Sequence, residues 1–461
     1  GIEELEAAPV ENLADFVNEL PALAGGDRPQ GSATSISSGA AGVNALNLRS
    51  LGNSRTLVLL DGQRNVGSLL NGSVDVNNFP QALVQRVDVV TGGASAAYGS
   101  DAVSGVVNFV LDKEFTGIKG TVDGGVTTYG DDRSWKVNIA GGTPFANGRG
   151  HILVNGEIAK RDGIFGVPKN REWDFRGCYV INNPAYVAGN GAPERLLTCG
   201  ASLSTVTYGG IITTTSLAGT TFGEGGVPRQ FDYGDQRRDP WMIGGEWESN
   251  QFLDRQTFDP AENRQGFFSR VSYDVTENIE LFAQTSWNHT RSRGVTGVQR
   301  DNGNITIQAD NAFLPDEIAA RMQAEGISSF RMGSVNGDLP LRKTDNDRHV
   351  TRYVVGASGD VDAFGSNWSW DAYYQKGISR VSENAVDITN NARMALAADA
   401  VRDPNTGVIV CRSTLTDPNN GCIPFNRMGT GVNNQQAIDY IQDDPYRNQR
   451  CHRSIRIRRA V

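Results

Sequence analysis

The chain has 461 residues, enough for two or three ordinary domains. Its 43 Lys and Arg residues are outnumbered by 52 Asp and Glu residues, giving a formal net charge of −9. This balance argues against nucleic acid as a partner, because phosphate binding needs a basic surface. No apolar run reaches about 18 residues, which excludes a helical membrane span but not barrel strands, whose apolar residues occur only at every second position.

The first element in chain order is a predicted helix over Pro9–Leu20. Apolar residues recur there at helical spacing, and Pro21 ends the pattern. Residues 25–42 are rich in Gly, Ser, Ala and Thr, a composition typical of a loop and equally of a flexible linker.

The next stretch, Asn47–Leu111, alternates short apolar runs with dense turn signals. The runs, which we interpret as strands, are Thr56–Leu60, Arg86–Val90 and Val106–Leu111. Asp61-Gly62 is a tight-turn dipeptide, and the segment TGGASAAYGSDAVSG allows backbone to pack closely on backbone. These features predict a compact module of mixed strands and short helices.

The same stretch resembles a known family. The pieces NLRSLG, TLVLLDGQR and FPQALVQRVDVVTGGASAAYGSDAVSGVVNFVL, in this order and spacing, are similar to the plug domain of TonB-dependent outer-membrane receptors. The alternative is a generic small α/β domain with Gly-rich turns. The resemblance implies a plug domain over residues 1–114 that is N-terminally incomplete, because the family's motif for the energy transducer is not in this sequence.

The resemblance also assigns roles to single residues. Signature positions are expected to form turns and close packing, with Arg86 and Asp88 making ion pairs to the barrel wall or, alternatively, lying on a solvated sheet face. The matching residues are Arg49, Asp61, Gly62, Arg86, Asp88, Gly92, Tyr98, Gly99 and Gly105. The loop after Asp61-Gly62 is expected at the outward apex of the plug. Its polar residues are then candidates for hydrogen bonds to a ligand: Arg64, Asn65 and Asn71.

After Leu111 the apolar residues alternate with polar ones along several segments. The segments are 117–129, 135–139, 151–159, 267–275, 279–288, 349–361 and 367–379. Such alternation is typical of transmembrane barrel strands and also of a soluble β-sandwich, and the adjacent plug favours the barrel. The expected fold is mainly β, with a small α/β plug followed by antiparallel transmembrane strands of an incomplete barrel of about 22 strands.

This interpretation makes residues 115–449 the N-terminal portion of the barrel. The apolar face of its strands is expected to meet lipid at Ile118, Val122, Val126, Trp368, Trp370 and Tyr374. The long insertions 161–266 and 291–348 are expected to be extracellular loops. Helical patterns over residues 315–326 and 391–401 are predicted to fold as loop helices.

Cysteine spacing is compatible with an exported protein. Cys178 and Cys199 lie within one long loop, and Cys411 and Cys422 lie close together further on. We predict two disulfides and one odd Cys451, with five unpaired thiols as the alternative. We expect no metal site, because the chain has only four His residues and no CxxC or paired-His spacing.

Catalytic motifs are not found, so we expect neither an enzyme nor a cofactor. The DPNTG and DPNNG segments suggest calcium less than they suggest plain Asp-Pro turns. The resemblance implies energised, plug-gated uptake of a scarce or bulky ligand, such as a siderophore, vitamin, oligosaccharide or peptide, across the outer membrane of a Gram-negative bacterium. The implied partners are the inner-membrane energy transducer TonB, a nutrient ligand and outer-membrane lipid. The alternative is a barrel protein that binds, senses or adheres without transport.

The final segment, residues 450–461, departs from the strand pattern. It reads RCHRSIRIRRAV, with five Arg and no acidic residue. We interpret it as the product of a frameshift or false stop; a basic tail is the alternative. With too few strands for a closed barrel, the chain is expected to be truncated at both ends, and the downstream DNA is expected to encode further strands in another frame.

Overall fold

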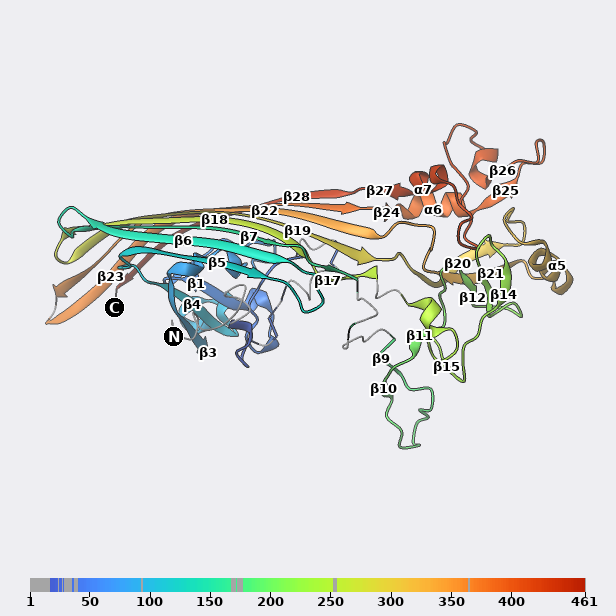
Figure 1. Cartoon of the computed structure of the whole chain (residues 1–461), viewed down its shortest axis with the longest axis horizontal. Coiled ribbons are helices and arrows are strands. Elements are labelled where there is room, and N and C mark those ends of the chain that lie inside the picture. The colour runs from blue at the N-terminus through green and yellow to red at the C-terminus, as the bar shows by residue number, and fades with distance from the viewer. Residues whose placement is uncertain are drawn as a thin grey trace.

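The computed structural model describes residues 17–23, 25–26, 28, 35–36, 40–92, 94–166, 171, 177–251, 255–363 and 365–460. One long sheet runs across the molecule, a small domain lies against it, and the long insertions gather at one end of the strands (Figure 1). Most of the predicted helix over Pro9–Leu20 and much of segment 25–42 lie outside the described residues. No described helix is long and apolar enough to cross a membrane.

The small domain contains the predicted mixed sheet. Its strands are β1 (Thr56–Leu60), β2 (Gln63–Arg64), β3 (Val84–Thr91) and β4 (Gly105–Leu111), in the order β2-β1-β4-β3. β1 runs parallel to β4, whereas the other neighbours are antiparallel. Short helical turns connect them: η1 (Leu48–Ser50), η2 (Asn53–Arg55), η3 (Val76–Asn78), η4 (Gln81–Leu83), α4 (Ser95–Tyr98) and η5 (Ser100–Ala102).

The long sheet has eight antiparallel strands in the order β28-β23-β22-β19-β18-β7-β6-β5. Their bounds are β5 (Gly117–Gly125), β6 (Ser134–Phe145), β7 (Gly150–Arg161), β18 (Ala261–Thr276), β19 (Ile279–Gly297), β22 (Arg342–Ala363), β23 (Ser366–Val386) and β28 (Tyr446–Ala460). All seven predicted segments are strands of this sheet. Several are longer than predicted, because towards the loops both faces become polar and the alternating signal is lost.

The eighth strand corrects the interpretation of the chain's last segment. We expected residues 450–461 to leave the strand pattern, but residues 446–460 pair with β23 in an unbroken antiparallel register. The ladder is built from backbone N–H and C=O groups, so a basic sequence whose apolar alternation is limited to Ile455 and Ile457 can still extend a sheet.

Short hairpins join the strands at the end opposite the long insertions (Figure 1). The insertions carry small strands: β8 (Ile164–Phe165), β9 (Tyr179–Asn182), β10 (Arg195–Thr198), β11 (Ala201–Leu203), β12 (Ile211–Ile212), β13 (Thr220–Phe222), β14 (Pro228–Gln230), β15 (Gln236–Arg238), β16 (Trp241–Ile243), β17 (Thr257–Asp259), β20 (Asp301–Gln308), β21 (Ser329–Ser334), β24 (Ile388–Thr389), β25 (Ala400–Arg402), β26 (Ile409–Cys411) and β27 (Gln442–Asp443). The described parts of these insertions therefore form small sheets of their own.

Helices complete these loops. The two predicted helices are present as α5 (Asp316–Glu325) and α6 (Asn391–Ala398), and the sequence analysis missed α7 (Gln435–Ile441). Short turns η6 (Trp247–Asn250) and η8 (Arg412–Leu415) lie in the same region. α5 buries Ile318 and Met322 against Phe330, and α6 packs with α7 in a second loop core. Disulfides join Cys178 to Cys199 and Cys411 to Cys422, and Cys451 on β28 is a free thiol.

Candidate functional site at the contact between the plug and the sheet

The small domain lies against one face of the long sheet, and this face is mostly polar. Alternation places every second residue of a strand on it. Its buried polar members include Asn155, Glu157, Arg264, Arg270, Gln284, Ser292, Arg348, Arg352, Gln375, Ser379 and Glu383. Buried polar groups are stable only where they have hydrogen-bond partners, so their partners show how the two parts are held together.

Arg352 on β22 joins the sheet to the small domain. Its Nη2 donates to Oε1 of Gln63 on β2 at 2.6 Å. Its other nitrogens donate to Oε1 of Gln284 and of Gln375 on the neighbouring strands, both at 3.1 Å. One guanidinium thus connects three strands of the sheet with the small domain, using the fork of donors that Arg provides.

A second group of bonds lies closer to the loops. The carbonyl oxygen of Ala41 accepts from Nη1 of Arg348 at 2.8 Å and from Oγ of Ser292 at 2.7 Å. The next residue is Gly42, with φ of +78°, and a Cβ built there would lie 2.6 Å from Cβ of Ser292. Glycine is therefore required for this approach of backbone to sheet.

Asp75 is the buried carboxyl group of this contact. Its Oδ1 accepts from the backbone N–H of Asn77 at 3.1 Å, and it precedes η3 as the N-cap. Burial raises the pKa of Asp75 to about 6, because the charged form loses its hydration, although the positive charge of Arg348 acts in the opposite direction. The group therefore titrates in a mildly acidic range.

A network within the sheet underlies these contacts. Buried Arg264 donates from Nε to Glu157 at 2.8 Å and from Nη1 to Glu262 at 3.0 Å. Nδ2 of Asn138 adds a hydrogen bond to Glu157 at 3.1 Å. These side chains are hydrogen-bonded to one another within the sheet. They therefore form a fixed polar surface on the face that meets the small domain.

A cavity of about 170 Å³ lies between the two parts near the short hairpins. Among its lining residues are Asp61, Gln63, Lys113, Arg270, Glu280 and Tyr373. Arg270 and Glu280 form an ion pair at 2.7 Å within this lining. Such a charged lining suits water rather than an apolar ligand.

Apolar contact is concentrated in one place. Phe79, Leu83 and Phe109 of the small domain share a core with Leu153 and Phe268 of the sheet. The rings of Phe79 and Phe109 meet edge to face with centroids 5.1 Å apart. The small domain is thus fixed by this apolar core, by the close approach of Val66 to Gly377 on β23, and by hydrogen bonds.

The signature residues mainly shape the small domain. Asp61 has φ of 51° and accepts from the N–H of Leu111 at 2.9 Å, and burial raises the pKa of its carboxyl. Gly62 donates to Oδ1 of Asn108 at 2.8 Å. A Cβ on Gly105 would lie 2.3 Å from the carbonyl oxygen of Val90. Positive φ values also occur at Arg49, Gly92 and Gly99, which lie in turns.

The proposed ligand residues are placed differently from expectation. Arg64 is turned inward and bonds to Asp101 and to the carbonyl oxygen of Tyr98. Asn65 is buried, with its carbonyl oxygen accepting from Arg453 at 3.1 Å. Only Asn71 is exposed, beside Leu70. Arg64 and Asn65 therefore hold the loop in place instead of meeting solvent.

The expected ion pairs of Arg86 and Asp88 to the barrel wall stay a prediction. The two side chains pair with each other at 3.2 Å on an exposed face of β3. They lie two residues apart on the strand and so project from the same face. Among the described residues the pair lies on a sheet face, and whether that face meets the barrel wall or solvent stays a prediction.

Sequence reasoning missed the residues that join the two parts. Arg348 and Arg352 lie four residues apart in DRHVTRY, both on the polar face of β22. A repeated arginine on the polar face of a strand next to a plug-like domain is a usable signal, because an arginine buried there needs several acceptors. Asp75 carried no comparable signal.

Comparison with known proteins assigns the small domain. Residues 1–106 match the family model of the TonB-dependent Receptor Plug Domain. The chain thus contains a plug followed by a long antiparallel sheet. The match identifies the small domain as a plug of the kind found in TonB-dependent receptors.

Solved structures of low sequence identity are also similar. The siderophore receptor PirA from Pseudomonas aeruginosa is 11% identical, with 84% of this chain and 52% of that chain covered and a TM-score of 0.34. The ferric-catecholate import receptor Fiu from E. coli is 12% identical, with 84% and 49% covered and a TM-score of 0.37. The chain spans about half the length of these proteins.

Proposed function

We propose that this chain is part of an outer-membrane receptor that takes up a scarce or bulky ligand by plug-gated transport energised through TonB. The ligand is of the siderophore, vitamin, oligosaccharide or peptide class. The long sheet forms part of the wall in the outer membrane, with Ile118, Val122 and Trp368 among its lipid-facing residues. The insertions lie outside the cell. Nothing in this proposal requires a covalent step.

The observation that carries the proposal is the polar contact between plug and sheet. The bonds of Arg352 to Gln63 and of Arg348 to Ala41 can be exchanged for bonds to water, and each contributes about 1.5–3 kcal/mol net. An apolar interface of the same extent would resist displacement more strongly, because its full area would become exposed to water. When TonB pulls on the plug, its hydrogen bonds to the sheet can thus break one at a time.

The test is a reversible lock between plug and wall. A Cβ built on Gly377 lies 2.6 Å from Cβ of Val66, so a Val66→Cys, Gly377→Cys pair reaches disulfide distance after the two Cβ atoms separate by about 1 Å. The lock is made in the full-length receptor carrying Cys451→Ser, which removes the free thiol. Each single cysteine variant serves as a control.

Uptake is measured with labelled ferric siderophores, cobalamin and maltooligosaccharides in cells with and without TonB. We expect one class to enter only with TonB, to stop entering in the locked receptor, and to enter again after reduction. Binding of that class without uptake in any state would instead support a binding or adhesion protein. Unchanged uptake through the locked receptor would contradict the gating.

A further inference from the structure

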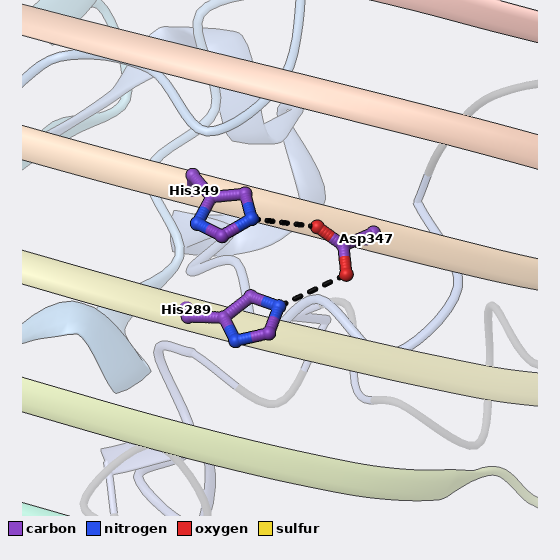
Figure 2. Close-up of side chains that lie close together, drawn as sticks. All are labelled: His289, Asp347 and His349. Carbon is purple, nitrogen blue, oxygen red and sulfur yellow. Dashed lines mark hydrogen bonds and ion pairs between the residues drawn. The ribbon is translucent and has the colours of Figure 1, made fainter.

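Two histidines and one aspartate meet on the sheet face that points away from the plug. Asp347 and His349 are two residues apart on β22 and therefore lie on one face, and His289 of β19 is directly opposite His349 in the register. Nε2 of His289 lies 2.9 Å from Oδ2 of Asp347, and Nε2 of His349 lies 2.9 Å from Oδ1. Figure 2 shows both imidazoles turned toward this single carboxylate.

We propose that His289, Asp347 and His349 form a binding site for a divalent transition-metal ion of the Zn²⁺ type. One ligand atom from each residue lies within 4.8 Å of the others. Imidazole nitrogen and carboxylate oxygen bind Zn²⁺ at about 2.0–2.2 Å, so small rotations of the three side chains bring them into a common coordination sphere. The proposal is independent of ligand uptake.

The local charges favour a cation at this point. Two neutral imidazoles and one carboxylate carry a net charge of −1, and their rings stack in parallel with centroids 4.2 Å apart. If both rings were protonated, two positive charges would be stacked against one carboxylate. A dication placed between the three groups balances the carboxylate and requires the imidazoles to be neutral.

The neighbouring ionic groups leave Asp347 available. Arg291, opposite Asp347 in the register, is paired with Asp345, two residues earlier on β22. Among the described residues, the ion pairs of Asp347 are those with the two histidines. Arg380 lies opposite His349 on β23 and, together with Arg291 opposite Asp347, is a cation that works against metal binding.

The site is reached from outside the sheet. The three side chains are partly exposed, at 27% for His289, 32% for Asp347 and 44% for His349. Trp287 lies beside them on the hairpin side, its ring 6.3 Å from that of His289. Three protein ligands leave a fourth coordination position for water or an external group. The ion would also link β19 to β22 through their side chains, in addition to the backbone hydrogen bonds between the two strands.

The experiment is calorimetric titration of ZnCl2 into the detergent-solubilised full-length protein. We expect one Zn²⁺ per chain, at least tenfold weaker binding in His289→Gln and in His349→Gln, and no specific binding when both are changed. Asp347→Asn should weaken binding similarly. Co²⁺ is expected to give a visible absorption band of a nitrogen- and oxygen-ligated site in the native protein but not in the double variant.

Matched controls keep each outcome decisive. His452→Gln removes an exposed histidine from β28 and should bind Zn²⁺ within about twofold of the native protein. Arg380→Gln should bind more tightly. Circular dichroism checks that each variant is folded. Native protein that takes up no stoichiometric Zn²⁺, or a folded double variant that binds as the native protein does, would overturn the proposal.

Discussion

Arg352 of the long sheet donates a hydrogen bond to the side-chain oxygen of Gln63 in the plug at 2.6 Å. The two residues are far apart in the sequence, and the same guanidinium also holds Gln284 and Gln375. Arg352 therefore contributes both to the stability of the long sheet and to the binding of the plug against it.

Replacing this guanidinium should loosen both parts. Arg352→Met leaves three buried amide oxygens without their charged donor, and at about 1.5–3 kcal/mol for each bond we expect a loss of at least about 4 kcal/mol. The measurement is the thermal midpoint in detergent, combined with the rate of proteolysis of the plug. Arg380→Met on the exposed face of β23 is the control and should change neither. A variant with native midpoint and native protection would contradict this role.

Gly105 tests whether the signature glycines are structural. Its φ is 138°, and an added Cβ would lie 2.3 Å from the carbonyl oxygen of Val90 on the paired strand β3. Gly105→Ala should therefore break the β3–β4 ladder and reduce the yield of folded protein. Gly156→Ala on β7, where no atom lies within 4 Å of the added Cβ, should be produced at native levels. Equal yields would show that the plug accommodates the methyl group.

Asp75 should make stability depend on pH in mildly acidic solution. Its pKa is raised from 3.8 to about 6 by burial, so the folded state holds the proton more tightly than the unfolded state. The stabilisation is fully present below pH 3.8 and is lost as the pH rises to about 6, a change of about 3 kcal/mol.

Denaturant unfolding at several pH values measures this slope. Asp75→Asn keeps an oxygen for the N–H of Asn77 and should flatten the dependence between pH 4 and about 6. Asp88→Asn, on the exposed face of β3, should keep the native slope. If the native and Asp75→Asn proteins follow the same curve, Asp75 is not the group that titrates.

The cysteines give a direct chemical test. With Cys178–Cys199 and Cys411–Cys422 bridged and Cys451 free, denatured but unreduced protein should show one reactive thiol per chain and, after reduction, five. Removing the second bridge by Cys411→Ser and Cys422→Ser should expose the segment that contains η8 to protease while the long sheet stays protected, because a bridge mainly restricts the chain it encloses. Three or more thiols before reduction would contradict the pairing.

Much of the architecture was predictable from local patterns. The alternation around Trp368 and Tyr374 identified β23, and the turn glycines around Asp61 identified the plug sheet, because both signals come from neighbouring residues. The strand ends were underestimated where both faces are polar. β28 was missed because in this arginine-rich segment the apolar alternation is confined to Ile455 and Ile457, too short a signal to mark a strand.

The sites were less predictable because they are built by pairing distant segments. Arg64 was expected to face outward, but its partners Tyr98 and Asp101 come from another turn of the plug. His289 and His349 become neighbours only through the β19–β22 register, which no spacing rule for metal ligands in a single segment detects. The small number of His residues and the lack of CxxC or paired-His spacing had argued against a metal site.

The shared core of Phe79 and Phe109 with Leu153 and Phe268 has a consequence for how the receptor assembles. These sheet residues lie on β7 and β18, early in the chain after the plug, whereas Arg352 and Gln375 come later. Contacts between segments close in sequence form faster than those between distant ones. We therefore expect the plug and the first hairpins to consolidate as one folding nucleus, with β22 and β23 docking afterwards, an order that pulsed hydrogen exchange would reveal as early protection of β4 and β7.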